Sequence, residues 1–426
     1  MRKRGINKGI LVLIIMILGH YSIPSAYGSG YAIYTQGATS TGQAAATIAH
    51  TDDPSAIFFN PALINELDKT QVMIGTTFLI PSREFTSQYT GNTQNGDNGV
   101  FFPSTIYITH KFDDNWSAGL GVFNPFGLGA KWPTTWEGRY IATDSELSTY
   151  NINPVVSYQA APWISVAAGL DVVFLDTTLE RNIYLAPFGL PDGAEKFKGS
   201  GTGVGYNLGL LLKPVKDVSI GASYRSMIKI GASGDTTFDL PVPQLAALFP
   251  NTGGSVGIVL PQQLQFGVCY KGFYPFTVEI GGRWEGWSSV KQLQFTFDQP
   301  IAGSNVYTSQ RDWKNTWSED IGFKYQLNDT VALLAGYLHQ GNPIPDQTYD
   351  PVVPDANANL VTIGTDLKFG DFKIGLAYGY QWFSTRTKNN AVDDNPNDGI
   401  VNPVTSANGT YKSSLNMVAV SLTYKF

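Results

Sequence analysis

Two basic side chains are the first candidates for binding chemistry, because the sequence pattern turns both toward the inner face of a predicted strand. In ISVAAGLDVVF (164–174) apolar residues alternate, and continuing the alternation places Arg181 on the opposite, inner face. In RDWKNTWSEDIGF the apolar outer face would hold Trp313 and Trp317, which leaves Lys314 on the inner one. An inward cation suits a ligand with a carboxylate, since a buried carboxylate without a partner is costly.

The same two cations could instead neutralise carboxylates of the chain itself. Acidic residues expected in the same interior are Asp171, Glu279, Glu285 and Asp320. Arg225 and Arg283 are further candidates for ligand contact. For Arg181 and Lys314 the sequence leaves ligand binding and structural pairing open.

Residues for catalysis do not form a recognisable set. A hydrolase triad needs a serine, a histidine and an acidic or amide partner, and His50, His110 and His339 show no such pattern. The motif GxxxxGK[ST] is absent, so no nucleotide-driven step is implied. A single cysteine, Cys269, excludes an intramolecular disulfide. We predict a protein that is not an enzyme and uses no cofactor or metal.

The N-terminus predicts export. Basic residues precede an apolar run at 9–19 that is too short to span a bilayer, and Ala26 and Gly28 fit a small-x-small cleavage pattern. We predict a signal peptide over residues 1–28 and a mature chain starting at Ser29. The leader holds four of the 28 basic residues and no acidic one, so the rest carries 24 basic and 34 acidic residues, a net charge of −10. This charge disfavours a nucleic-acid partner.

Strands with one apolar face recur along residues 70–426. In DFKIGLAYGYQWF (371–383), Leu376, Tyr378 and Tyr380 share one face, and Ala377 and Gln381 share the other. Short turns alternate strictly with long Gly/Pro/Asn-rich loops, and together they join about fourteen strands, the last ending in an aromatic residue. We predict an all-β fold, a transmembrane antiparallel β-barrel of about 14 strands in the bacterial outer membrane.

Residues 29–69 lack this alternation. FFNPALINELDKT (58–70) reads as a short helix in which Asn60 is the N-cap and Pro61 takes the first helical position. About forty residues are too few for a stable independent domain, and the segment is too polar for lipid. We predict that residues 29–69 form a hatch that plugs the lumen of a barrel formed by residues 70–426.

The third predicted strand, WSAGLGVFNPFGLGAKW, contains a weak point. Pro125 has no N–H for the ladder, and Gly127 and Gly129 weaken the strand further. One interpretation is a kink; the other is that the strand ends at Asn124 and a loop begins. The residues concerned are Asn124, Pro125, Phe126 and Gly127.

Two long loops carry apolar runs, NIYLAPFGLP (182–191) and PVPQLAALFP (241–250). Apolar patches that face solvent are usually contact surfaces. We expect either a capture surface for a hydrophobic substrate or two loops that merely pack on each other. The residues in question are Leu185, Phe188, Leu245, Leu248 and Phe249.

The chain resembles the FadL-type transporters of long-chain fatty acids and hydrocarbons. The resemblance rests on GYAIYTQGA, on DDPSAIFFNPAL, on NPIPDQ (342–347) and on the barrel layout, and it covers nearly the whole chain after residue 28. It implies a hatch-plugged barrel in the outer membrane that transports hydrophobic small molecules passively. Long-chain fatty acids are the expected substrates, and monoaromatic or other uncharged hydrocarbons are the alternative.

The resemblance also implies roles for residues. Arg181 and Lys314 match the family's carboxylate-binding arginine and lysine, and Tyr31 matches an aromatic residue that moves to release the ligand. In the family the third strand kinks beside the hatch motif, here Asn60, Pro61 and Ala62, and opens a lateral portal. We therefore expect Asn60 within hydrogen-bonding reach of backbone 124–129. Besides the ligand, the expected partners are outer-membrane lipid and lipopolysaccharide, and a wall that opens sideways favours a monomer.

Overall fold

The computed structural model describes residues 30–426 except residue 98 and residues 396–400. The predicted signal peptide, 1–28, and the predicted start at Ser29 lie outside the described residues. Among the described helices, none has the length and apolar character required for a membrane span.

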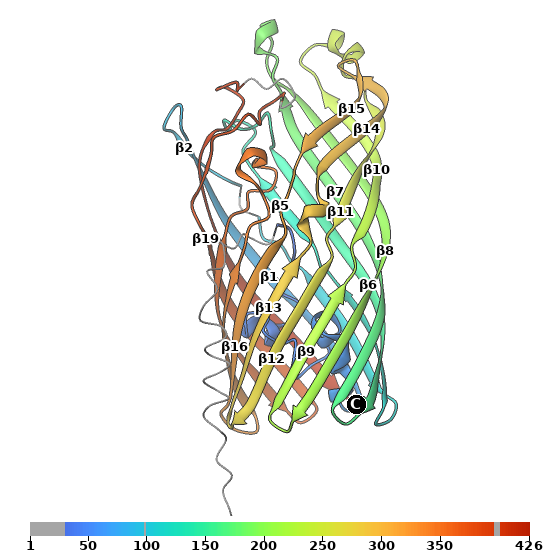
Figure 1. The fold of residues 1–426 in the computed structure, drawn as a ribbon. Coiled ribbons are helices and arrows are strands. Elements are labelled where there is room, and N and C mark those ends of the chain that lie inside the picture. Colours follow the sequence, from blue (N-terminus) through green and yellow to red (C-terminus); the bar gives the residue numbers. More distant parts are fainter. Residues whose placement is uncertain (1–29, 98, 396–400) are drawn as a thin grey trace, which may run out of the picture.

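The described strands form one closed antiparallel barrel with fourteen wall strands, as predicted (Figure 1). Closing the sheet is what allows strands to cross a bilayer, because every interior backbone group finds a partner on a neighbouring strand. The wall strands in chain order are β1 (Thr70–Ser87), β3 (Ser104–Lys111), β4 (Trp116–Phe123) with β5 (Gly127–Lys131), β6 (Asp144–Ala161), β7 (Ile164–Ile183), β8 (Gly193–Val215), β9 (Val218–Arg225) with β10 (Ile228–Asp239), β11 (Thr252–Leu260) with β12 (Gln263–Phe273), β13 (Phe276–Glu285) with β14 (Gln292–Ile301), β15 (Ser304–Gln310) with β16 (Thr316–Gln326), β17 (Val331–Gln340), β18 (Ala358–Phe369), β19 (Phe372–Phe383) with β20 (Arg386–Lys388), and β21 (Gly409–Lys425).

The barrel closes where β1 meets β21, in register from Gln71↔Lys425 to Ser87↔Gly409. A short strand, β2 (Thr93–Asn95), pairs with the loop end of β1. Short turns lie at one end of the barrel, next to the C-terminus, and long loops extend from the other (Figure 1). Four of these loops or strand breaks carry 3₁₀ turns: η2 (Ala186–Phe188), η3 (Pro243–Ala247), η4 (Trp287–Ser289) and η5 (Asp346–Thr348).

Alternation along the strands sorts the side chains as predicted. In β19 the rings of Tyr378, Tyr380 and Trp382 are exposed on the outer face, whereas Ala377 and Gln381 are buried inside. Tyrosine and tryptophan on the outer surface, above and below an aliphatic band, are typical of barrels in lipid.

The hatch lies inside the lower half of the barrel, as the blue segment in Figure 1. Its helices are short: α2 (Ala38–Gly42), α3 (Ala56–Phe59) and the 3₁₀ helix η1 (Pro61–Glu66). Asn60 caps η1, its Oδ1 accepting the N–H of Ala62 at 3.1 Å, with Pro61 at the first helical position. Helices this short are not stable alone, so the hatch depends on the wall around it.

Ion pairs fix the base of the hatch to the wall. Asp52 Oδ2 lies 2.6 Å from Nζ of Lys324 in β16, and Asp53 Oδ2 lies 2.9 Å from Nζ of Lys373 in β19. The second pair is almost fully buried, where loss of one partner would leave an uncompensated charge. The base is therefore the rigid part of the hatch.

Glu279 of β13 is a further anchor. Its carboxylate accepts the backbone N–H groups of Ile48 and Ala49 and lies 2.6 Å from Nδ1 of His50. His50, Cys269 and Glu279 bring their polar atoms within 4.8 Å of one another, a set that could hold a metal ion. The carboxylate already serves the hatch amides, so we interpret the cluster as an anchor.

Glycines in the wall let the hatch backbone come close. A Cβ on Gly221 would lie 2.0 Å from the carbonyl oxygen of Ile48, and one on Gly336 would lie 2.4 Å from the carbonyl carbon of Gln43. A larger residue at either position would push the hatch backbone off the wall.

Candidate functional site

The third wall strand kinks and then continues. β4 stops at Phe123 and β5 resumes at Gly127, and both pair with β6. The register shifts between Phe123↔Asn151 and Gly127↔Ser148, so one extra residue bulges out of the strand. Among the described strands β5 pairs with β6 alone, and its other edge has no wall neighbour. The strand does not end at Asn124, which was the second interpretation of the sequence.

The first residues of the hatch occupy that open edge. Ala32 faces Phe126 in an antiparallel bridge. The N–H of Ile33 donates to the carbonyl of Pro125 at 2.9 Å, and the N–H of Gly127 donates to the carbonyl of Tyr31 at 2.8 Å. The segment 31–33 therefore replaces the missing wall strand over the length of the kink.

Asn124 joins the two sides of the break. Its Nδ2 donates to the carbonyl of Thr149 in β6 at 2.6 Å, and its Oδ1 accepts the N–H of Ser104 in β3 at 3.1 Å. Its own carbonyl accepts a bond from Nε2 of Gln36 in the hatch at 2.7 Å. The break is thus held by defined hydrogen bonds.

The expected contact of Asn60 with the third strand is wrong. Its Nδ2 donates to the carbonyl of Ile48 at 2.8 Å and to that of Leu210 in β8 at 3.0 Å. The reason is that η1 packs into the base of the barrel, against β6, β7 and β8. Pro61 and Ala62 lie with it, so this motif fixes the base and the segment 31–36 contacts the break.

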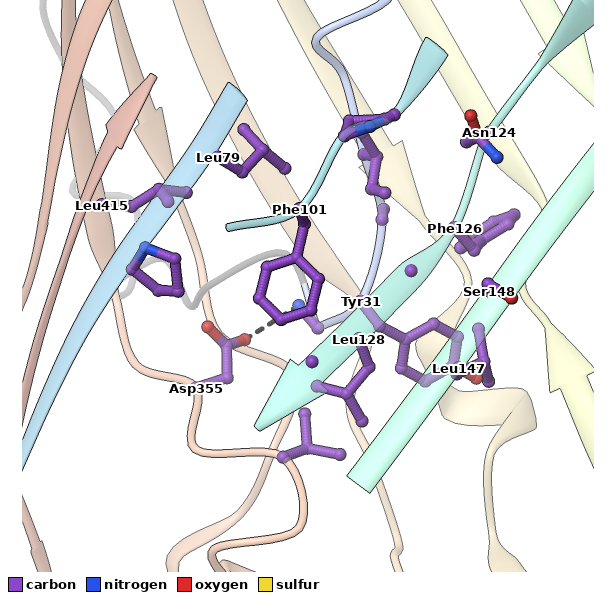
Figure 2. A pocket seen from close by; sticks show the side chains of 18 of the residues that line it. Tyr31, Leu79, Phe101, Asn124, Phe126, Leu128, Leu147, Ser148, Asp355 and Leu415 are labelled. Atoms are coloured by element: carbon purple, nitrogen blue, oxygen red, sulfur yellow. Dashed lines mark hydrogen bonds between the residues drawn. The ribbon is translucent and has the colours of Figure 1, made fainter. Parts of the chain in front are cut away.

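A cavity of about 320 Å³ lies at the break (Figure 2). On the lumen side it is lined by Tyr31 and Phe126, and at the wall by Phe102 and Tyr150. The side chains of Phe102 and Tyr150 are 57% and 52% exposed, on the outer face of the barrel. The cavity therefore reaches from the interior to the lipid-facing side. Figure 2 also shows Asp355, which accepts the N–H of Gly30 at 2.8 Å.

Tyr31 borders this cavity within an aromatic cluster. Its ring packs edge-on against Trp287 and Phe126, with centroids 4.7 and 5.9 Å away, and lies 5.6 Å from Trp313. Its hydroxyl donates to the carbonyl of Val259 at 2.7 Å. The phenol is therefore satisfied, and the ring separates the cavity from the apolar lumen above.

The prediction for Trp313 and Lys314 is reversed in the structure. Trp313 is buried in the lumen, 2% exposed. Lys314 is exposed, and it lines neither this cavity nor the smaller one described below. The strand β16 begins only at Thr316, and Asp312 has a positive φ of 46°, so the alternation does not extend back through this stretch. Arg311 is the cation that faces inward here.

A second, smaller cavity of about 80 Å³ lies between apolar side chains of β7, β8, β14 and β15. Arg181 lines it, with Nε 2.7 Å from Oε2 of Glu195 and the guanidinium over the ring of Tyr307. Arg311 lines it as well, with Nη1 2.6 Å from Oδ2 of Asp350. Both cations have the chain's own carboxylates as partners.

The two further arginines considered from the sequence are also engaged. Arg225 forms an ion pair with buried Asp171, and Arg283 stacks 3.4 Å over the ring of Tyr34. Neither arginine lines either of these two cavities. Their role here is structural.

The apolar loops are only partly exposed. Phe188 is 70% exposed and Leu248 43%, and Leu245 and Phe249 are half-buried. Leu185 is buried at 2%, so it does not belong to an outer patch. The carbonyl of Leu248 accepts the N–H of Ala302, which sets the loop 241–250 on the turn between β14 and β15.

Sequence reasoning missed the loop residues that enter the lumen. Asp355 and Val353 come from the long loop between β17 and β18, yet both are buried and line the large cavity. The run DPVVPDA places apolar residues in a loop, and this pattern could have indicated that the loop is buried. Gln36, which bonds the break, lies in GYAIYTQGA, a stretch that carried the resemblance but did not indicate this contact.

Comparison with known proteins places these features in a family. Residues 22–426 match the family described as outer membrane protein transport protein (OMPP1/FadL/TodX). An outer membrane protein of Neisseria meningitidis serogroup B is 24% identical, over 97% of this chain and 98% of its own. A long-chain fatty acid transport protein of Salmonella typhi is 22% identical, over 77% of this chain and 81% of its own.

Solved structures share the fold. A FadL homologue of Pseudomonas aeruginosa superimposes with a TM-score of 0.83 at 20% identity, covering 93% of this chain and all of its own. The toluene transporter TodX of Pseudomonas putida gives 0.74 at 18% identity, covering 92% of this chain and 99% of its own.

Proposed function

Because the chain belongs to the outer membrane protein transport protein family (OMPP1/FadL/TodX), we propose that it moves hydrophobic small molecules passively through the barrel and releases them sideways into the membrane. The observation that carries this proposal is the cavity at the strand break, which has Tyr31 on its lumen side and Phe102 and Tyr150 on its outer side. A hydrophobic molecule can pass from such a cavity to lipid without entering water.

The route begins at the loops. Phe188 and Leu248 present apolar surface to solvent, and we propose that they capture substrate together with Leu245 and Phe249. From there the apolar lumen leads past the second cavity toward Tyr31. The hatch closes the direct path below, since its base is bonded to the wall.

Long-chain fatty acids are the substrate we propose. Relatives carry that substrate in their names, and TodX is named for toluene, so monoaromatic or other uncharged hydrocarbons are the alternative. Arg181 forms an ion pair with Glu195, with Nε 2.7 Å from Oε2. A ligand carboxylate would therefore have to displace Glu195 before it could bind Arg181. Lys314 is not proposed as a contact, because it lies outside the cavities.

The test is binding of radiolabelled oleate and of toluene to purified protein, with Arg181→Ala beside the wild type. If Arg181 contacts the ligand, oleate binding weakens at least fivefold and toluene binding stays. Oleate binding that survives undiminished would make Arg181 a structural partner of Glu195 alone. If wild type binds neither compound, transport of hydrophobic molecules is the wrong function.

We propose no enzymatic role, in line with a family of transport proteins. We also propose a monomer surrounded by lipid and lipopolysaccharide, because the outer face at the break must stay free for release. Chemical cross-linking in native membranes tests this proposal, and a stable oligomer that covers Tyr150 would contradict it.

A further inference from the structure

Arg83 is a cation of the large cavity that has no partner among the described residues. It lies on β1 and lines the cavity, while its neighbour Glu84 points outward and pairs with Lys412 of β21. Among the described residues no hydrogen bond, ion pair or ring contact involves its guanidinium. Its cross-strand neighbour is Ser413, whose side chain also lines the cavity.

The other described arginines are all engaged. Five form ion pairs, and a sixth hydrogen-bonds a glutamine and stacks on a tyrosine; these are Arg139, Arg181, Arg225, Arg311, Arg386 and Arg283. The barrel interior thus satisfies its guanidinium groups as a rule, as the cost of burying an unpaired charge demands. Arg83 departs from that rule inside the cavity that reaches the lipid.

The cavity offers Arg83 no anion of its own. Asp355 lines the same cavity, but its Oδ2 accepts the N–H of Gly30 at 2.8 Å and no ion pair joins it to Arg83. The remaining lining is largely apolar, and the polar groups near Arg83 are Ser413 and Ser414 on β21. This makes one corner cationic and hydroxyl-bearing, whereas the rest is mainly apolar with a few polar side chains, among them Gln381 and Asp355.

We propose that Arg83 binds the carboxylate of a long-chain fatty acid in the cavity at the strand break. A guanidinium binds a carboxylate through two parallel hydrogen bonds, which the unpaired Arg83 is free to make. The acyl chain then lies along the apolar lining toward Phe102 and Tyr150. The inference rests on the proposed function and narrows its substrate to an amphiphile with an anionic head.

The experiment measures binding of oleate and oleyl alcohol to the purified full-length protein in detergent, at neutral pH, where the carboxylic acid is ionised. The variants are Arg83→Gln and Arg83→Lys. The matched control is Lys412→Gln, which removes one positive charge from the neighbouring register position on the outer face. Oleyl alcohol has the same chain without the charge, so it separates head-group binding from chain binding.

We expect Arg83→Gln to weaken oleate binding about tenfold or more, which is about 1.4 kcal/mol. Oleyl alcohol should bind Arg83→Gln within about twofold of wild type. Arg83→Lys should recover part of the affinity, because it restores the charge without the paired donors. Lys412→Gln should bind both compounds as wild type does.

Two outcomes would overturn the inference and leave the proposed function standing. In one, Arg83→Gln binds oleate as tightly as wild type; in the other, acid and alcohol lose affinity equally, which indicates a general change in the cavity. If wild type binds neither of these compounds and does not bind toluene, the proposed function itself fails. Toluene binding without oleate binding would support the hydrocarbon alternative and reject a head-group role for Arg83.

Discussion

Tyr31 separates two apolar spaces of the lumen. The ring of Tyr31 lies among Phe126, Trp287 and Trp313, and one side of this aromatic cluster borders the cavity at the break. The hydroxyl of Tyr31 donates to the carbonyl of Val259. A ring held by edge-on contacts and one hydrogen bond is fixed yet can be displaced at moderate cost. This position suits a gate that yields to a ligand.

Replacing Tyr31 tests that role. Tyr31→Ala removes the ring, so we expect ionic conductance in planar bilayers to rise severalfold and stability to fall by about 3–5 kcal/mol, as for other buried aromatic residues. Tyr31→Phe keeps the ring and loses only the bond to Val259, so its conductance should stay within about twofold of wild type. Wild-type conductance in Tyr31→Ala would show that the ring does not close the path.

Single residues also show how far the sequence could predict the site. Alternation placed Arg181 on the inner face because β7 is regular from Ile164 to Ile183. The same rule placed Trp313 and Lys314 on the wrong faces, because the left-handed conformation at Asp312 breaks the alternation before β16 begins. The partners Glu195 and Asp350 could not be predicted, since they depend on how strands and loops meet in space.

At the scale of elements, the break in the third strand and the start of the hatch form one unit. The segment 31–33 bonds to the backbone at Pro125 and Gly127, where a wall strand would otherwise lie. The sequence predicted the weak point from Pro125 but assigned the contact to Asn60. Both segments are short, and nothing in their local pattern tells which one reaches the break.

A disulfide can lock this unit. Ala32 and Phe126 face each other in an antiparallel bridge, and the hydrogen bonds lie on either side of this pair. In such a non-hydrogen-bonded pair the Cα atoms lie about 4.5 Å apart, which a disulfide can span. In the double variant Ala32→Cys, Phe126→Cys we expect oxidation to stop oleate uptake by cells and reduction to restore it. The buried Cys269 should not react.

The single variants Ala32→Cys and Phe126→Cys are the controls, since they carry the side-chain changes without the cross-link. If a fully cross-linked protein, verified by mass spectrometry, transports oleate at the wild-type rate, then the segment does not move during transport.

Strand number and strand continuity differed in how well they could be predicted. The fourteen strands followed from the alternation of short turns and long loops, because each connection is marked by Gly, Pro and Asn. Apart from the one in the third strand, the breaks inside strands, such as the one between Arg225 and Ile228, were not predicted. Ser226 and Met227, which form that break, include neither glycine nor proline, so the residue types give no sign of an interruption.

At the scale of the molecule, the hatch is fixed below and bonded by a few residues above. Its base carries the ion pairs of Asp52 and Asp53 and the Glu279 anchor, all far along the chain from their partners. Such contacts between distant segments hold the plug in a barrel whose wall is otherwise built from neighbouring strands. The sequence indicated a plug from its composition but could not indicate these partners.

The His50 anchor predicts a pH dependence. Burial alone would lower the pKa of His50, but hydrogen bonds with Cys269 and Glu279 and the charge of Glu279 raise it to about 10. The pKa of His50 is therefore higher in the folded state, about 10, than in the unfolded state, about 6.5. Below pH 6.5 the charged imidazole contributes its full stabilisation to the folded state. This contribution is lost as the pH rises from 6.5 toward 10.

We therefore expect the midpoint of thermal unfolding in detergent to fall between about pH 7 and pH 10. His50→Gln should be less stable at neutral pH and should lose most of this slope. An unchanged slope in His50→Gln would assign the pH dependence to other groups, and protease digestion of the hatch at both pH values would show whether it leaves the wall.

The bond between Gly30 and Asp355 has a practical consequence for anyone who handles this protein. Gly30 lines the cavity and its N–H donates to Asp355, so an engineered change at Gly30 would alter the space proposed for the ligand. A bulky tag placed at Gly30 would compete with substrate for that space.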